Sequence, residues 1–306
     1  MSHAAASSPL VARFAIPSPI DLTSTLAPLR HGRDDPTIRF GAGGVWLARA
    51  TAAGPATLRL AAGAGEIVAE AWGLGAELAL EAAPGLAGIL DDPSPLIPRH
   101  PLVADLMRRL AGLRLPSTGQ LVPALIPAVT EQKVTGPEAH AAYSGLVNRF
   151  GEPAPGPADL LLPPSAERLA SLAYFEFHPL GLERRRAELL RRIGSHGARI
   201  ESWLALPADE ARERLQTIPG IGPWTAAEAT RAAFGDPDAV SVGDAHLPDL
   251  VSWALAGEPR ADDARMLELL QPYAGQRARV VRLLEASDIK IPRFGPRFAP
   301  RRISGI

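Results

Sequence analysis

The stretch of sequence most suited to binding chemistry is a glycine-rich turn between two expected helices, LQTIPGIGPWTA over residues 215–226. Gly220 and Gly222 lack the Cβ atoms that would keep this turn away from another molecule. Their backbone N–H groups, with those that open the next helix, would form a small anion site. A phosphate diester fits such a site without any basic side chain. An ordinary tight turn between two helices is the alternative interpretation.

A carboxylate follows this turn at a defined distance. Asp244 lies 20 residues after Trp224, within VGDAHL over residues 242–247. We expect Asp244 to open a helix, where the helix dipole keeps a carboxylate ionised. Aspartate is also a favoured N-cap residue, so the same position is consistent with a purely structural cap.

Together, these segments resemble the hairpin, the Gly/Pro-rich loop and the essential aspartate of the helix–hairpin–helix DNA glycosylase superfamily. Residues 121–135, LVPALIPAVTEQKVT, resemble the helix and DNA-wedge loop of that family. The mixed character of the N-terminal region narrows the resemblance to the DNA-3-methyladenine glycosylase II branch. The resemblance is good over about residues 120–286, and it implies a mainly α fold with a small α+β N-terminal domain.

The resemblance implies a role for each matching residue. Asp244 would be the catalytic carboxylate, which stabilises positive charge on the sugar as the bond to the base breaks. Asp249 is the nearest rival carboxylate, and its spacing fits less well. Gln132 and Lys133 would form the wedge that fills the gap left by a flipped nucleotide, although a solvated loop tip is the alternative for Lys133. The residues implied to bind the DNA backbone are Gly220, Ile221, Gly222 and Thr225.

Three residues are candidates for the base pocket. Trp224 matches an aromatic position of the resembled branch, where electron-rich rings hold a cationic alkylated base after base flipping. Glu228 stands four residues later, where that branch often has another aromatic, and this departure leaves the substrate range open. Tyr174 could supply a further ring. For both aromatic residues, packing in the core is the alternative.

Missing residue types narrow the chemistry. The chain has no cysteine, which excludes thiol catalysis and the four-cysteine iron–sulfur cluster of some branches. Bifunctional members carry a lysine nucleophile two positions after the second glycine of the hairpin, where this chain has Trp224. The only lysines, Lys133 and Lys290, are remote from that point in sequence. We therefore predict a monofunctional glycosylase for alkylated purines of the 3-methyladenine type, acting in base excision repair of alkylation damage without a cofactor.

Two other functions remain open at this point. A non-catalytic helix–hairpin–helix DNA-binding protein would have no reason to keep Asp244, and a glycosylase for deaminated or oxidised bases is disfavoured by Trp224. No histidines show metal-ligand spacing, so no side-chain metal site is expected. The resemblance implies a monovalent cation held by backbone carbonyls of residues 217–222. The expected partner is double-stranded DNA containing damaged bases, bound by a monomer.

Composition and charge suggest how the chain is organised. The 306 residues are 46% hydrophobic and 21% charged, as in folded proteins of more than one domain. We predict a strand-rich domain over 1–100, an all-α domain over 101–290 and a basic tail over 291–306. Residues 276–306 carry a net charge of +6, which suits either a polyanion or a solvated end. With neither a secretory signal nor a membrane span expected, we predict a cytoplasmic protein.

The elements that must position these residues follow from hydrophobic periodicity. Strands are predicted at 37–40, 45–49, 56–60 and 66–70. Helices are predicted at 101–112, 119–132, 136–150, 165–173, 180–196, 199–204, 207–216, 223–234, 245–256, 262–271 and 275–286.

Overall fold

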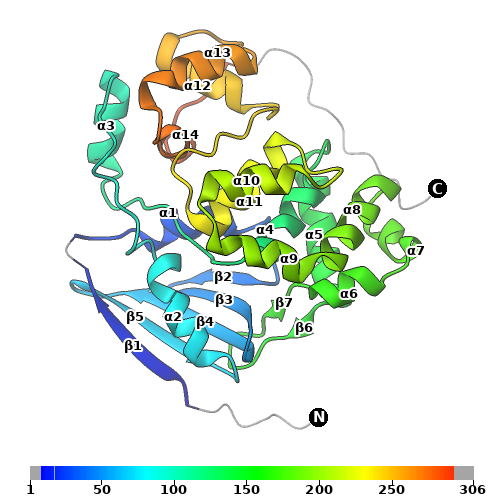
Figure 1. The fold of residues 1–306 in the computed structure, drawn as a ribbon. Helices are drawn as coiled ribbons and strands as arrows, with labels where there is room; N and C mark the ends of the chain where they lie inside the picture. Colours follow the sequence, from blue (N-terminus) through cyan, green and yellow to red (C-terminus); the bar gives the residue numbers. More distant parts are fainter. Residues whose placement is uncertain (1–7, 17, 293–306) are drawn as a thin grey trace.

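The structure, a computed structural model, describes residues 8–16 and 18–292. It is mainly helical with one small antiparallel sheet near the N-terminus, so the predicted fold class is confirmed (Figure 1). The arginines of the predicted tail, from residue 293 onward, lie outside the described residues. Within the part of the chain that is described, no helix is both long and apolar enough to span a membrane.

The sheet has five antiparallel strands in the order β1-β5-β4-β3-β2. The four predicted strands are confirmed, and the structure adds β1, which pairs with β5. Along β3, Val45, Leu47 and Arg49 alternate with more exposed residues, because successive side chains of a strand point to opposite faces. Arg49 therefore lies on the buried face of the sheet. The strands are β1 (Leu10–Ala15), β2 (Ile38–Gly41), β3 (Gly44–Thr51), β4 (Gly54–Ala62) and β5 (Glu66–Trp72).

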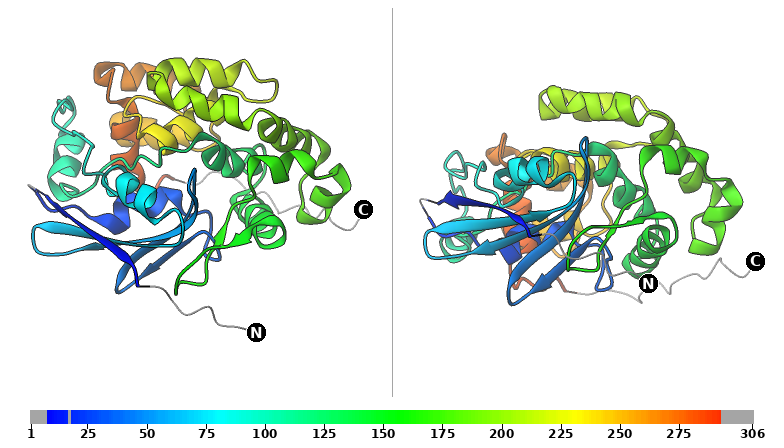
Figure 2. Two further views of the ribbon diagram at one scale, coloured as in Figure 1. Left: turned by 60° about the horizontal axis from the view of Figure 1, so that its bottom comes forward. Right: turned by 90° about the horizontal axis from the view of Figure 1, so that it is seen from below.

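Two helices of the N-terminal region were not delineated by the sequence analysis. The short α1 (Leu22–Leu26) packs on β3 and β4, and α2 (Ala76–Leu86) packs on four of the five strands. Leu26 and Leu86 are fully buried in the core that these helices form with the sheet. Figure 2 shows the sheet and its helices on one side of the molecule and the remaining helices on the other.

The rest of the described chain is helical apart from one two-stranded ribbon, β6 (Glu152–Pro153) paired with β7 (Leu161–Leu162). The Pro-rich segment 152–157 thus begins in this ribbon. The helices are α3 (Pro101–Arg109), α4 (Leu121–Thr130), α5 (Gly136–Phe150), α6 (Ala166–Ser171), α7 (Tyr174–Phe177), α8 (Arg184–Ser195), α9 (Gly197–Ser202), α10 (Ala208–Gln216), α11 (Pro223–Phe234), α12 (Leu247–Ala256), α13 (Asp263–Leu270) and α14 (Arg277–Glu285).

Five predicted helix starts are corrected by two or more residues, and the structure shows a local cause for two of them. The helix predicted from residue 180 begins at Arg184, because Gly181 takes a left-handed conformation with φ +77° that ends the preceding turn. The helix predicted from residue 245 begins at Leu247, because the side chain of Asp244 accepts the N–H groups of His246 and Leu247 and so caps the helix there. In addition, α7 interrupts a stretch that the sequence analysis left without a helix.

The helices form two separate cores. One core joins α4–α11, and the other joins α3, α12, α13 and α14 (Figure 1). Gly235, with φ +66°, ends α11 in the left-handed region that favours glycine, and the chain then crosses from the first core to the second. The second core is also tied to the N-terminal region, because Arg282 of α14 donates to the carbonyl of Ser24 at 2.6 Å. The three cores therefore meet around α11 and α14.

A buried ion pair fixes this junction. Arg279 of α14 donates to both carboxylate oxygens of Asp91 at 2.6 and 2.8 Å, and each side chain is only 7% exposed. Asp91 also accepts the N–H of Leu115 at 3.0 Å. This carboxylate therefore joins α14 to two segments of the chain that follow the sheet.

We expect Asp91→Ala to destabilise the protein by about 3–5 kcal/mol, because it leaves Arg279 buried without its partner. Asp105→Ala on α3 is the matched control, since the Asp105 pairs with Arg108 and Arg109 are solvent-exposed. Its expected cost is below about 1 kcal/mol. Urea unfolding of both variants measures the two values. Equal losses would contradict a special role for the Asp91–Arg279 pair.

Candidate active site

The glycine-rich turn connects α10 to α11 and presents its backbone outward. Gly220 has φ +102°, so this position requires glycine, whereas a Cβ on Gly222 would meet no atom within 4 Å. Ile218 and Ile221 anchor the turn because both side chains are buried in the helical core. Pro223 begins α11, where its missing N–H costs nothing.

The turn offers unpaired backbone donors. No described residue accepts a hydrogen bond from the N–H of Gly220, Gly222 or Trp224. These donors lie beside the positive end of the α11 dipole, which favours an anion. Two other predicted backbone-binding residues are placed differently: Ile221 donates its N–H to Ile218, and the hydroxyl of Thr225 is buried. Neither side chain faces solvent, so the anion site rests on the glycines and the start of α11.

The predicted wedge loop is held against this turn. Gln132 donates through Nε2 to the carbonyl of Gly220 at 3.1 Å and to Oγ1 of Thr225 at 2.8 Å. The buried Arg186 of α8 holds the start of this loop by donating to the carbonyl of Thr130 at 2.6 Å. Lys133 is exposed at the next position, with φ +55°. The amide of Gln132 is thus used within the protein, and Lys133 is the free side chain of the loop.

Asp244 uses its two carboxylate oxygens for different contacts. Oδ1 accepts the N–H groups of His246 at 2.7 Å and Leu247 at 2.9 Å, where α12 begins. Oδ2 accepts the indole N–H of Trp224 at 3.0 Å. The capping interpretation and the reactive interpretation are therefore compatible, because the cap occupies one oxygen and the other is turned toward Trp224.

Asp244 and Trp224 line one cavity of about 360 Å³. Glu228 lines it as well, so three of the predicted site residues are brought together. Four carboxyl groups face two guanidinium groups around this cavity, which favours a cationic occupant. The other lining residues are Ala27, Pro28, Glu131, Arg231, Arg282 and Glu285.

Glu228 is the least expected member of this cavity. Its Oε1 accepts hydrogen bonds from Arg231 at 3.0 Å and from the hydroxyl of Ser241. Arg231 also pairs with Glu285 at 3.2 Å. Burial raises the pKa of Glu228 above the ordinary glutamate value, and Arg231 and Ser241 oppose this effect. No described residue donates to Oε2, which leaves this oxygen for a ligand.

Two candidates from the sequence lie elsewhere. Tyr174 is on α7, with its ring beside His178 and packed against the helical core, and it does not line the cavity. The core alternative for Tyr174 is the one that the structure supports. Asp249 accepts the N–H of Ala261 at 3.0 Å and is also absent from the cavity wall.

No model of a known protein family matches the chain. The chain is 29% identical over 166 residues to DNA-3-methyladenine glycosylase 2 of Escherichia coli K12, a match that covers 53% of this chain and 57% of that protein. Among solved structures, a 3-methyladenine DNA glycosylase from Archaeoglobus fulgidus has a TM-score of 0.74 at 19% identity, covering 90% of this chain and 97% of that one. An 8-oxoguanine glycosylase/lyase from Clostridium acetobutylicum, solved with double-stranded DNA, has a TM-score of 0.68 at 12% identity, covering 87% and 91%.

The similarity to the two solved structures extends over nearly the whole chain and establishes its fold. The chain therefore has the fold of helix–hairpin–helix DNA glycosylase structures. The chain spans little more than half of the length of the E. coli relative that it matches. A 3-methyladenine glycosylase and an 8-oxoguanine glycosylase/lyase both have this fold, so the fold alone does not set the substrate.

The sequence analysis missed four charged residues of the cavity. Arg231 could have been found, because Trp224, Glu228 and Arg231 stand at positions i, i+4 and i+7 of one helix and share a face. Glu131 lies directly before the wedge residues that were singled out. Arg282 and Glu285 gave no such signal, because α14 reaches the cavity only through the packing of the second helical core.

The free energy of unfolding should depend on pH through the buried Glu228. Its raised pKa means that the folded protein holds this proton more tightly than the unfolded chain does. The contribution of Glu228 therefore favours folding at low pH and is lost as the pH rises above the ordinary value of 4.5. Relative to Glu228→Gln, the wild type should lose stability across this range.

Urea unfolding between pH 4 and pH 7 measures this difference. Glu77→Gln is the control, because Glu77 is an exposed residue of α2 and its profile should run parallel to that of the wild type. A parallel profile for Glu228→Gln as well would mean that Glu228 is not desolvated in the folded protein.

Proposed function

We propose that this chain is a DNA glycosylase that hydrolyses the N-glycosidic bond of alkylated purines in double-stranded DNA. One observation carries the proposal: Asp244 presents Oδ2 beside the indole of Trp224 in an acidic cavity that adjoins the unpaired N–H groups of the hairpin. The hairpin would hold a DNA phosphate, and the cavity would receive a base flipped out of the duplex.

Asp244 would supply the catalytic charge. Breaking the bond between a purine and deoxyribose builds positive charge on the sugar ring, and a fixed carboxylate stabilises that charge. The same oxygen can orient and deprotonate the attacking water. Its orientation is set in advance, because the start of α12 holds Oδ1 and Trp224 holds Oδ2. A pre-oriented carboxylate stabilises the transition state without a further reorganisation.

The electrostatics of the cavity support a cationic base as substrate. An alkylated purine such as 3-methyladenine carries positive charge and is already a good leaving group. The excess of carboxyl groups favours its binding, and the face of Trp224 adds a cation–π contact. The E. coli and A. fulgidus proteins are both 3-methyladenine glycosylases, which agrees with this substrate class.

None of the described residues that line the cavity is a lysine, which supports monofunctional chemistry. Trp224 occupies the hairpin position of the lysine nucleophile of bifunctional members. Lys133 lies on the wedge loop near the hairpin, but it is exposed and does not line the cavity. Without an amine near the sugar, no Schiff base forms, and water is the nucleophile. The product would be an abasic site in an uncut strand.

The decisive variant for the activity is Asp244→Asn. It retains an oxygen to cap α12 and removes the charge, so we expect base release to fall by about 100-fold or more while duplex binding changes little. Single-turnover release of 3-methyladenine and 7-methylguanine from defined duplexes measures the first quantity. Equal losses of binding and turnover would mean that Asp244 is only a structural cap.

Two controls sharpen this assay. Asp249→Asn removes a carboxylate on the same helix but outside the cavity, and it should leave base release unchanged. The reacted strand should break only after alkali treatment, because a monofunctional enzyme leaves the sugar intact. Strand cleavage without alkali, trapped by borohydride and lost in Lys133→Ala, would contradict the monofunctional mechanism. Release of 8-oxoguanine in preference to alkylated purines would contradict the proposed substrate class.

The hairpin glycines give a second, independent prediction. Gly222→Ala places a methyl group in open space at the proposed phosphate site and strains nothing. It should weaken binding of damaged and undamaged duplexes alike, because phosphate contacts carry no sequence information, and it should leave thermal stability unchanged. Gly220→Ala, in contrast, should lower thermal stability, since φ +102° is unfavourable for alanine. Unchanged duplex affinity in Gly222→Ala would contradict phosphate binding at this turn.

A further inference from the structure

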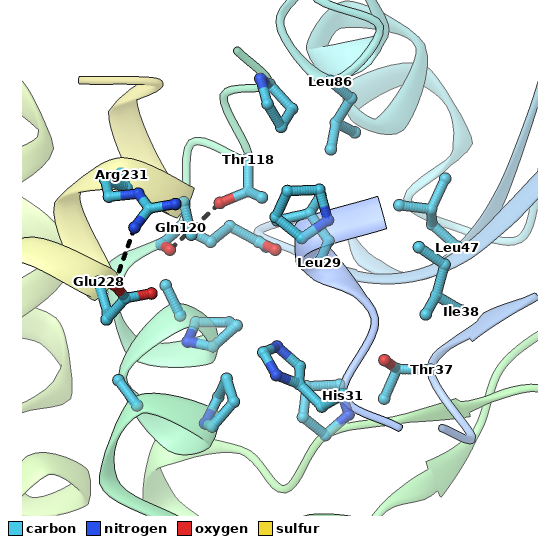
Figure 3. A pocket seen from close by; sticks show the side chains of 18 of the residues that line it. Leu29, His31, Thr37, Ile38, Leu47, Leu86, Thr118, Gln120, Glu228 and Arg231 are labelled. Carbon is cyan, nitrogen blue, oxygen red and sulfur yellow. Dashed lines mark hydrogen bonds and ion pairs between the residues drawn. The ribbon is translucent and has the colours of Figure 1, made fainter. Parts of the chain in front are cut away.

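A second cavity lies directly behind the proposed base pocket. It has a volume of about 140 Å³ and lies between the buried face of the sheet and helices α4 and α11. Figure 3 shows Glu228 and Arg231 on one side of it, with Ile38 and Leu47 of the sheet on the opposite side. Leu29, Leu86 and several prolines add to a largely apolar wall. We call this space the inner chamber.

The inner chamber and the outer cavity share a wall. Pro28, Glu131, Glu228, Arg231 and Arg282 line both spaces. Four of these five are long charged side chains, so the wall between the two spaces consists mainly of side-chain ends. A group attached to a base in the outer cavity would therefore reach the inner chamber between these side chains.

Two buried arginines give the inner chamber a chemical preference. Arg49 and Arg282 line it and are 6% and 7% exposed. Each uses one Nη2 donor, toward the carbonyls of Thr118 and Ser24 respectively, both at 2.6 Å. For both, no described residue accepts from the buried Nε. No described residue accepts from Nη1 of Arg49, so this guanidinium keeps a donor for a hydrogen-bond acceptor brought into the chamber.

The electrostatic state of Arg49 agrees with this preference. Burial lowers the pKa of Arg49 to about 10, and the charge of Glu201 only partly opposes the effect. The guanidinium is still charged at neutral pH, yet no carboxylate of the described chain forms an ion pair with it. The inner chamber thus holds a positively charged side chain that has no carboxylate partner among the described residues.

We propose that the inner chamber receives the N-alkyl arm of a flipped purine and selects arms that carry a carbonyl oxygen. This inference rests on the proposed function. The chamber is close in size to an engineered cavity of about 150 Å³ that binds benzene, so it has room for about six heavy atoms. A neutral carbonyl suits the path better than a carboxylate, because the carboxyl groups around the outer cavity repel an anion.

Two guanine derivatives form a matched pair of probes. The arms of 7-(2-oxopropyl)guanine and 7-isobutylguanine have the same branched heavy-atom skeleton and differ in one oxygen against one methyl group. Calorimetric binding of the free bases to the full chain measures the contribution of that oxygen without requiring catalysis. We expect the ketone to bind about tenfold more tightly, as for a hydrogen bond to a charged donor.

Variants locate the effect in the inner chamber. Arg49→Met removes the guanidinium but keeps an apolar side chain, and it should remove most of the preference for the ketone. Arg59→Met on neighbouring β4 is the matched control, because Arg59 pairs with Glu70 and lines neither space. Ala232→Leu, which fills part of the inner chamber, should weaken the binding of both arms relative to 7-methylguanine. Thermal unfolding of each variant confirms that it is folded.

Several results would overturn the inference. Equal affinities for the two arms, no binding of either arm, or a preference that survives Arg49→Met would each do so. Failure of the proposed function has a different signature: no base is released from duplexes containing 7-methylguanine, while the preference among free bases persists. If bases are released from duplexes but the preference for the ketone arm is absent, the proposed glycosylase activity stands and the inner chamber has no part in its specificity.

Discussion

The carboxylate of Asp244 is the constraint on which the site depends. Its Oδ1 accepts the N–H groups of His246 and Leu247, so the start of α12 holds it in place. Its Oδ2 accepts the indole N–H of Trp224, which belongs to the first turn of α11. One side chain thus links the hairpin to the second helical core. The distance between the proposed phosphate site and the proposed catalytic oxygen is fixed by this link.

The cavity exists because three cores meet there without filling the space between them. Its walls come from α11 and the wedge loop, from α14, and from the turn after α1. The buried pair of Arg279 with Asp91 and the bond from Arg282 to Ser24 hold α14 against the N-terminal region. Charged side chains at this junction keep the space polar, and Nε of the buried Arg282 has no acceptor among the described residues. The same packing that closes the fold therefore creates both the proposed base pocket and the inner chamber behind it.

Local sequence patterns predicted the parts of the site that one segment builds. The hairpin, Asp244, Trp224 and Glu228 all lie within residues 215–247, where glycine chemistry, capping and helical spacing can be read directly. Tyr174 was predicted to line the base pocket but packs against the helical core, because the sequence alone does not distinguish an aromatic residue that faces a pocket from one that faces a core. Arg282 and Glu285 could not be predicted, since only tertiary packing brings α14 to α11. Strand β1 was missed because none of its six residues is buried: four are exposed and two are half-buried, so no buried face marks it in the sequence.

The central claim is that Asp244 is placed to stabilise positive charge on the sugar of a flipped nucleotide. Duplexes carrying either a cationic pyrrolidine or a neutral tetrahydrofuran in place of the damaged nucleotide isolate that charge, because the two rings differ little in shape. The wild-type protein should bind the pyrrolidine duplex more tightly, and this preference should disappear in Asp244→Asn while affinity for the tetrahydrofuran duplex is retained. Equal affinity of the wild type for the two duplexes would contradict the claim.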